Sequence, residues 1–191
     1  MSTNDILTKD DAHRRYLVGK EPMIFHCHHY NAFLQQTIQD ADYVDSRPFL
    51  IGAANEVAYA QLSELFRELG LTTVEARKEL TQDLYRWAGF GTMDLVDLSD
   101  KGGLVRSENS HYSNAWTAKF GRADAPVDFF GTGWLSGALA AIYGKEQGTY
   151  RATQRSCMGA GDERNEYLLE HSEAPNYHIY TSPGTGPLSE H

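Results

Sequence analysis

The sequence predicts an α+β fold in which helices pack on one face of an antiparallel sheet. Two segments, 48–69 and 73–88, repeat apolar residues every three or four positions, which is typical of amphipathic helices. A third segment, 129–143, has a helical pattern, and two strand-like segments, 148–156 and 165–170, follow it. Because the helices come first and the strands gather around one Gly-rich helix, we expect the helices to cover one face of the sheet.

The length and composition of the chain indicate a single globular domain. The chain has 191 residues, of which 41% are hydrophobic and 23% are charged, and these values are close to the average for globular proteins. We expect a polar N-terminal segment with a short helix over 1–22, one folded domain over 23–181, and a flexible tail rich in Pro, Gly and Ser over 182–191.

Charge and hydropathy exclude two classes of partner. The formal net charge is −9 and the Lys and Arg residues are scattered, so no basic surface for nucleic acid is expected. No apolar run reaches the roughly 18 residues of a membrane span, and segment 1–20 lacks the hydrophobic region of a signal peptide. We therefore expect a cytoplasmic protein whose two cysteines, Cys27 and Cys157, are free thiols.

The elements near the N-terminus are predicted from short patterns. Segment 10–17 has helical character, and Pro22 would end any helix there. The apolar run that follows predicts a strand over 23–30. Asn31 is a suitable N-cap, so a helix is expected to begin directly after that strand.

The ends of the two long helices and the segments after them are also recognisable. Gly70 follows the first helix as a stop signal, and segment 72–75 matches the capping box, in which a Thr hydroxyl and a Glu carboxylate satisfy free backbone donors. Segments 93–98 and 103–105 predict a hairpin around a Gly-containing turn. Segment 107–120 is neither cleanly helical nor alternating, as is common for a ligand-facing strand.

The helix predicted over 129–143 carries small residues on one face, at Gly133, Gly137, Ala140 and Ala141. Glycine lowers the stability of a helix, so these residues need another reason to be present. We expect a second backbone or a ligand to approach this face closely.

A histidine-rich cluster concentrates the chemistry of the chain. Three histidines and one cysteine occupy four consecutive positions, His26, Cys27, His28 and His29. Imidazole and thiolate groups bind soft metals, move protons near neutral pH and attack carbonyl carbons. If the cluster lies on a strand, alternation places His26 and His28 on one face and Cys27 and His29 on the other.

The second half of the chain resembles the 4-vinyl-reductase-like domain. The similarity covers roughly residues 105–170, and it rests on the runs Pro126-Val127-Asp128-Phe129, Gly133-Trp134-Leu135-Ser136-Gly137-Ala138-Leu139, Tyr143-Gly144, Ser156-Cys157-Met158-Gly159-Ala160-Gly161-Asp162 and Tyr167-Leu168-Leu169. That family is a small-molecule-binding module, found in bacteriochlorophyll biosynthesis, in stand-alone prokaryotic proteins and in the sensors of phenol-responsive transcriptional activators. The resemblance implies an α+β fold related to vesicle-tethering and nitric-oxide-sensing domains, with a buried apolar pocket, so that 23–181 would be a ligand-binding domain.

The resemblance also implies where a zinc ion would be held. The zinc-bearing members use a Cys after the Pro-Val pair, a Glu three residues before the motif Cys, that Cys itself and a Cys after Gly-Asp. The corresponding positions here are Asp128, Gln154, Cys157 and Asn165. A structural zinc site needs about four Cys or His ligands, so we expect the family's zinc site to be absent and Cys157 to be a small buried residue.

Two functions from different classes remain open. In the first, the protein is a stand-alone binding module for a small, partly apolar molecule. One or two of the histidines His26, His28 and His111 would hydrogen-bond a polar group of that molecule. The aromatic residues expected to line its pocket are Phe25, Tyr30, Tyr112, Trp116 and Trp134.

In the second, the same scaffold is an enzyme. His26, His28 and His111 could hold a transition metal with an open coordination position, or Cys27 could act as a nucleophile with His29 as its base. Against both stands a structural reading, in which the histidines lie on the surface and the tryptophans pack in the core. The long helices, each with one apolar stripe, also predict a homodimer formed through the helical half.

Overall fold

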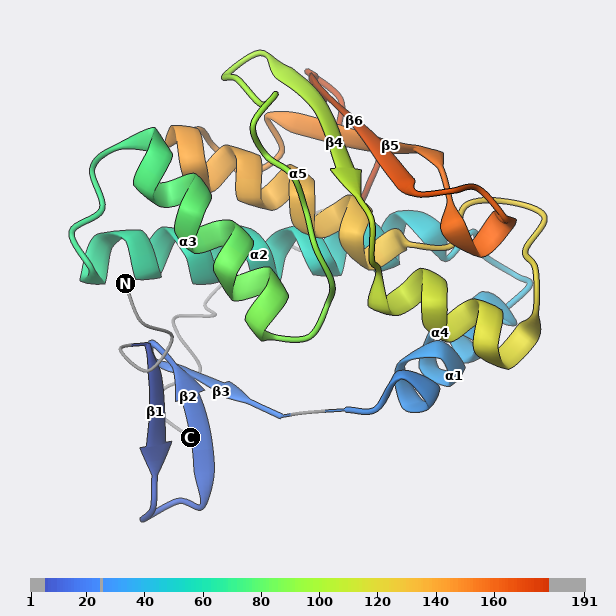
Figure 1. The fold of residues 1–191 in the computed structure, drawn as a ribbon, viewed down its shortest axis with the longest axis horizontal. Coiled ribbons are helices and arrows are strands. Elements are labelled where there is room, and N and C mark those ends of the chain that lie inside the picture. The colour runs from blue at the N-terminus through green and yellow to red at the C-terminus, as the bar shows by residue number, and fades with distance from the viewer. Residues whose placement is uncertain (1–5, 25, 179–191) are drawn as a thin grey trace.

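The computed structural model describes residues 6–24 and 26–178 (Figure 1). The helices are α1 (His28–Gln39), α2 (Arg47–Glu68), α3 (Val74–Trp87), α4 (His111–Phe120) and α5 (Phe129–Tyr143), with a short 3₁₀ turn over Met158–Ala160. One antiparallel sheet has the order β4-β6-β5, formed by Gly102–Ser107, Asn165–His171 and Tyr150–Ser156. A second antiparallel sheet has the order β1-β2-β3, formed by Leu7–Asp10, Arg15–Val18 and Glu21–Met23.

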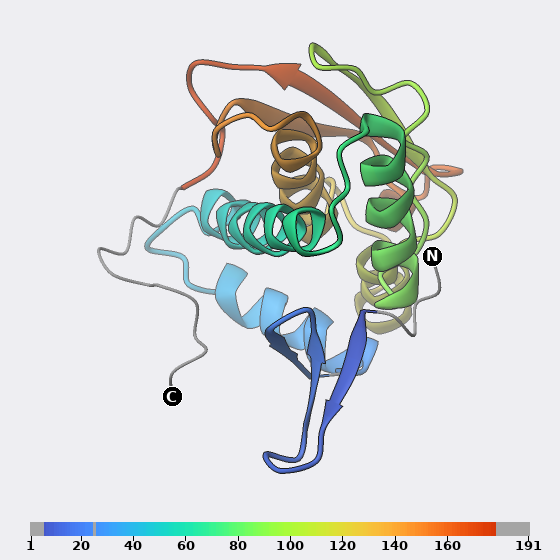
Figure 2. The same ribbon diagram turned by 90° about the vertical axis from the view of Figure 1, so that its left-hand side faces the viewer.

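The elements lie in successive layers, as the side view in Figure 2 shows. The β4-β6-β5 sheet covers α5, α2 packs along the other side of α5, and α1 lies beyond α2. The β1-β2-β3 sheet projects from the side of the molecule opposite the larger sheet, although its Val18 is buried in the main core. The predicted α+β fold, with helices on one face of an antiparallel sheet, is therefore confirmed.

Helix α5 is the centre of the core, because every residue from Gly131 to Ile142 is buried. Its small residues let α2 approach: a Cβ atom on Gly133 would lie 2.0 Å from the carbonyl oxygen of Ile51, and one on Gly137 would lie 2.2 Å from that of Asn55. The close backbone approach predicted for this face is thus confirmed, and the neighbour is α2.

The helices and strands that were predicted from longer periodic segments agree with the structure. Helices α2, α3 and α5 and strands β5 and β6 form where periodicity and turn residues placed them. The start of α3 differs by one position, because its N-cap is Thr73, whose side chain accepts a hydrogen bond from the backbone N–H of Ala76. The capping-box spacing had pointed to Thr72 instead.

The helix predicted over 10–17 is wrong, because β1 and β2 pair there as an antiparallel hairpin. The Asp10 carboxylate accepts hydrogen bonds from the backbone N–H of His13 and the guanidinium of Arg15, and Arg14 adopts a positive φ of 55°. These local hydrogen bonds stabilise a tight turn in competition with a helix.

The strand predicted over 23–30 is also wrong. Strand β3 ends at Met23, and α1 begins at His28 with Cys27 as its N-cap, so Asn31 lies inside the first turn. A distant contact fixes helix α1 in place: Gln35 is buried, and its Nε2 donates to the carbonyl oxygen of Val127 over 2.9 Å. Strand alternation therefore does not divide the histidine cluster.

Two further segments differ from their predictions. Segment 107–120 contains helix α4, whose N-cap Ser110 accepts a hydrogen bond from the backbone N–H of Ser113. In the predicted hairpin only β4 is a regular strand, and segment 93–98 runs beside it through an isolated bridge between Asp94 and Arg106. The predicted tail over 182–191 and the side chain of Phe25 lie outside the described residues.

Candidate functional site

Two adjacent pockets meet at Asn31 and Tyr112. The first, of about 180 Å³, is called the histidine pocket, and it is lined by Met23, Ile24, His26, Asn31, Ala88, Phe90, His111 and Tyr112. The second, of about 200 Å³, is called the interhelix pocket because it lies between α1 and α2, and it is lined by Asn31, Leu34, Gln35, Ile38, Leu50, Ala53, Ala54, Val57, Tyr112 and Phe130.

His111 is the polar centre of the histidine pocket. It is the first residue of α4, it is half-buried, and its backbone N–H donates to the carbonyl oxygen of Phe90 over 2.9 Å. The Asn31 amide nitrogen lies 3.1 Å from His111 Nε2. Because the amide donates, Nε2 is the accepting nitrogen and Nδ1 carries the proton.

Burial lowers the pKa of His111, and the charge of His28 lowers it further, while Asp128 opposes the shift. The imidazole is therefore neutral near pH 7, where it can both accept and donate hydrogen bonds. Burial also raises the pKa of Tyr112, with a second contribution from Asp128, so its phenol group stays protonated. His111 and Tyr112 are thus uncharged hydrogen-bonding groups near pH 7.

An aromatic wall backs the pocket. The ring centroids of Phe90 and His111 lie 6.3 Å apart, edge to face, and those of Phe90 and Phe130 lie 4.4 Å apart. Tyr112 stacks on Phe130 at 5.0 Å. Aromatic walls with a few placed polar groups are typical of sites for small organic ligands.

The structure brings three of the predicted ligand residues, His26, His111 and Tyr112, to the histidine pocket. Trp134 is placed elsewhere, because it is 2% exposed and packs on Tyr85 in the core at a ring distance of 4.7 Å. Tyr30 is half exposed and packs on the His26 ring at 4.4 Å.

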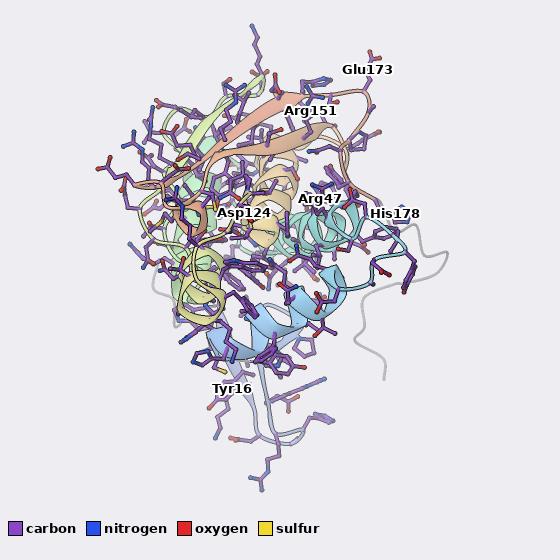
Figure 3. All side chains as sticks on the ribbon, turned by 90° about the vertical axis from the view of Figure 1, so that its right-hand side faces the viewer. Tyr16, Arg47, Asp124, Arg151, Glu173 and His178 are labelled. Atoms are coloured by element: carbon purple, nitrogen blue, oxygen red, sulfur yellow. The ribbon has the colours of Figure 1, made fainter. Side chains whose placement is uncertain are left out.

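Trp116 lines a different feature, a groove of about 640 Å³ whose walls are both polar and apolar. Arg47 and Asp124 also line this groove, and both are labelled in Figure 3. The Arg47 guanidinium already donates two hydrogen bonds to the Asp45 carboxylate, each of 2.8 Å. Trp116 therefore does not join the histidine pocket.

The three histidines proposed as metal ligands do not assemble into a metal site. The ring of His28 is 6.5 Å from that of His111, but His28 is exposed and lies against His29 at 4.1 Å. Within residues 6–24 and 26–178, no group of three or more His, Cys, Asp or Glu side chains is arranged to hold a metal ion. The prediction of this ligand set relied on strand alternation, whereas α1 begins in this segment.

The proposed nucleophile and base are not assembled either. Cys27 is exposed at the start of α1 and its side chain makes no N-cap hydrogen bond, while the ring contact of His29 is with His28. In the described part of the chain, no hydrogen bond joins the Cys27 thiol to an imidazole. The thiol therefore has no positioned base.

Five residues of the histidine pocket are not identified from the sequence as ligand groups, namely Met23, Ile24, Asn31, Ala88 and Phe90. The sequence marks Asn31 as a helix cap, and Phe90 lies between two glycines after α3, where no periodic pattern marks it. The one signal for Asn31 is its position two residues after the histidine cluster. None of the helices in the described part combines the length and the apolarity needed to cross a bilayer.

No protein-family model matches the chain, and no curated protein matches it. Solved structures do match. The phenol-responsive sensory domain of the transcription activator PoxR, in complex with phenol, has a TM-score of 0.71 at 19% identity, covering 88% of this chain and 86% of that one.

Two further solved structures have lower TM-scores. A vinyl-4-reductase family protein from Methanocaldococcus jannaschii has a TM-score of 0.52 at 14% identity, covering 81% of this chain and 86% of that one. A trafficking protein particle complex subunit 3 from Naegleria fowleri, covalently bound to palmitic acid, has a TM-score of 0.51 at 10% identity, covering 77% and 96%. At these identities the likeness shows the fold, and the predicted resemblance to the 4-vinyl-reductase fold is confirmed at that level.

Proposed function

We propose that this protein is a binding module for a small, partly apolar aromatic molecule, which it takes into the histidine pocket. The observation that carries the proposal is His111, a half-buried and neutral imidazole that Asn31 orients beside an aromatic wall. A hydroxyl group on the ligand could accept a hydrogen bond from Nδ1–H of this imidazole, because Nε2 already accepts from Asn31, while the ring of the ligand packs on Phe90.

The size of the pocket agrees with a ligand of one aromatic ring. Its volume is about 180 Å³, and an apolar cavity of roughly 150 Å³ is known to hold benzene. The PoxR sensory domain, which has the same fold, is described in complex with phenol, and this supports the same class of ligand here. Met23 and Ile24, from the segment before α1, complete the apolar lining.

Phenol is the probe that tests the proposal, measured by isothermal titration calorimetry against benzene. We expect phenol to bind more tightly than benzene, and His111→Ala to weaken phenol binding about tenfold, the effect of losing one hydrogen bond. His29→Ala is the matched control, because His29 is exposed and lines neither pocket. Equal affinity for phenol in wild type and His111→Ala would contradict the proposal.

We also propose that two copies of the chain pair through the helical half. Helix α1 supports this, because it leaves Tyr30 53%, Phe33 51% and Leu34 48% exposed. Phe33 also meets Phe120 of α4 edge to face, which extends the apolar surface. Light scattering would show a dimer for wild type and a monomer for Phe33→Glu, whereas a wild-type monomer at high concentration would reject the pairing.

A further inference from the structure

The four positions at which the resemblance places zinc ligands meet in one buried part of the molecule. Asp128 and Asn165 are 0% exposed, and Cys157 is 1% exposed. The backbone N–H of Asp128 donates to Gln154 Oε1 over 3.1 Å, and Asn165 Nδ2 lies 3.3 Å from Asp128 Oδ2. The four side chains therefore lie close together, so whether they could hold a metal depends on the chemistry of their donor atoms.

The side chains present do not suit zinc. Both carboxylate oxygens of Asp128 already accept hydrogen bonds, Oδ1 from the backbone N–H of Gly131 and Oδ2 from Ser110, Tyr167 and Asn165. Of the four residues at these positions, only Cys157 offers a soft donor, and zinc sites are built from about four such groups.

The amide side chains also fail as ligands. Asn165 Oδ1 accepts from the backbone N–H of Met158 over 2.7 Å and from the Ser113 hydroxyl over 3.2 Å. The one buried atom of this group that lacks a hydrogen-bond partner in the described chain is Gln154 Nε2, which is a donor and would repel a cation. The oxygen atoms of Asp128 and Asn165 are thus used in hydrogen bonds with neighbouring groups and are not available to bind a metal ion.

We propose that a metal-free hydrogen-bond network centred on Asp128 takes over the structural task at this position and fixes the start of α4. Asp128 caps α5, and a carboxylate at a helix N-terminus interacts favourably with the exposed N–H groups and the helix dipole. The same carboxylate accepts a hydrogen bond of 2.7 Å from Tyr167 of β6. It thereby ties the start of α5 to the sheet.

Ser110 connects the network to α4. Its hydroxyl donates to Asp128 Oδ2 over 2.5 Å and accepts from the backbone N–H of Ser113 over 3.2 Å, so one side chain caps α4 and joins it to α5. Ser113, in the first turn of α4, accepts a hydrogen bond from Asn165 Nδ2 over 3.0 Å. The next residues after Ser110 are His111 and Tyr112, so the network holds the segment that lines the histidine pocket.

Metal content of the wild-type protein gives the first test. Protein from zinc-supplemented cells, purified without chelators, should contain far less than one zinc per chain by plasma mass spectrometry, and its melting temperature should not change with 1,10-phenanthroline. About one zinc per chain that is lost in Cys157→Ser, with a melting temperature that falls on chelation, would overturn the proposal.

A converse variant tests the position itself. Asp128→Cys combined with Gln154→Glu and Asn165→Cys supplies four zinc-type ligands together with Cys157, and should bind about one zinc per chain with chelator-sensitive melting. A folded triple variant that binds no zinc would show that the four positions are not arranged as a metal site. If the triple variant does not fold, the wild-type measurement still decides the proposal.

Hydrogen exchange tests the link to α4. In Ser110→Ala, the amides of residues 111–114 should exchange about tenfold faster or more, because the cap and the link to Asp128 are both lost. Ser156→Ala is the control, since its hydroxyl also donates one hydrogen bond, to the carbonyl oxygen of Arg164, outside this network. Tyr167→Phe, which keeps the ring, is the milder variant. Unchanged exchange in both Ser110→Ala and Tyr167→Phe would overturn the link.

Discussion

The side-chain amide of Asn31 lies 3.1 Å from Nε2 of His111, and this pair joins α1 to α4 across the histidine pocket. The two residues are far apart in sequence, yet each is in the first turn of its helix. The pair holds the imidazole in its neutral form and leaves Nδ1 as the donor. Protonation of His111 would therefore break the hydrogen bond.

The stability of the protein should depend on pH through His111. Burial lowers its pKa below the usual value of about 6.5, so between these two pKa values the unfolded chain binds more protons than the folded one. Stability should therefore rise with pH across this window, reach its full value above the unfolded pKa, and fall as the pH drops toward the folded pKa. Urea unfolding of wild type and His111→Gln between about pH 5 and 8 measures this.

The charged groups near His111 provide control variants for this pH dependence. His28 lowers the pKa of His111 and Asp128 raises it, so His28→Gln should raise the folded pKa and thereby narrow the pH window and weaken the pH dependence without removing it. His13→Gln, at the exposed hairpin turn far from the pocket in sequence, controls for the loss of a histidine. A pH profile that is the same in His111→Gln and wild type would refute this assignment.

The contact between α2 and α5 makes Gly137 intolerant of a side chain. A Cβ atom there would lie 2.2 Å from the carbonyl oxygen of Asn55, so the two helices must separate in Gly137→Ala. We expect a loss of about 1–3 kcal/mol in unfolding free energy, as for other overpacked cores. Ala118→Ser adds one atom at an exposed position of α4 and should change stability by less than about 0.5 kcal/mol in the same urea titration.

The sequence was informative where local patterns decide the structure. Helix α5 is buried all round, and its glycines predict the close approach of a second backbone or a ligand, which in the structure is α2. The helix predicted after Asn31 is present, but α1 begins earlier than predicted, at His28. Its start is misplaced because Met23 and the residue after it have the pattern of a strand, whereas α1 is fixed by a distant contact, from Gln35 to the backbone of Val127. Tertiary contacts of this kind override a short local pattern.

The pocket was only partly predictable for the same reason. His111 was selected from its residue type and neighbours, but its partner Asn31 comes from a helix that the sequence placed differently. Trp134 has the composition of a pocket residue, yet its contact with Tyr85 places it in the core. Residue type identifies which groups could serve a site, and only the packing of α1 on α4 decides which of them meet.

The identity of the α3 N-cap residue can be tested by mutation, with the neighbouring threonine as the matched control. Thr73 accepts a hydrogen bond of 3.3 Å from the backbone N–H of Ala76, so Thr73→Ala should lower the unfolding free energy by about 1 kcal/mol. Thr72→Ala should have almost no effect, because Thr72 is exposed and lies before the cap. If chemical denaturation shows the larger loss for Thr72→Ala, the helix begins one residue earlier than in the structure.

Asn55 lies at the centre of a second buried polar cluster, and its removal should be among the most destabilising single changes. The residue is 0% exposed, and its amide nitrogen donates to the hydroxyls of Ser136 over 2.8 Å and Tyr177 over 3.1 Å. Its oxygen accepts from Gln147 over 3.0 Å. Asn55→Leu removes all three hydrogen bonds and leaves Gln147 Nε2 without this acceptor, although the Ser136 and Tyr177 hydroxyls keep the hydrogen bonds that they donate to backbone carbonyls. We expect a loss of about 2–4 kcal/mol in unfolding free energy.

A double variant tests the hydrogen bond between Asn55 and Tyr177. Tyr177→Phe keeps the ring but removes the hydroxyl that accepts from Asn55 and donates to the carbonyl oxygen of Tyr150, so urea unfolding should give a loss of about 1–2 kcal/mol. In the double variant Asn55→Leu with Tyr177→Phe, the cost should be smaller than the sum of the two single losses, because the hydrogen bond between the two side chains counts in both single losses but is lost only once. Additive losses would mean that Asn55 and Tyr177 contribute to stability independently, contrary to their hydrogen bond in the structure.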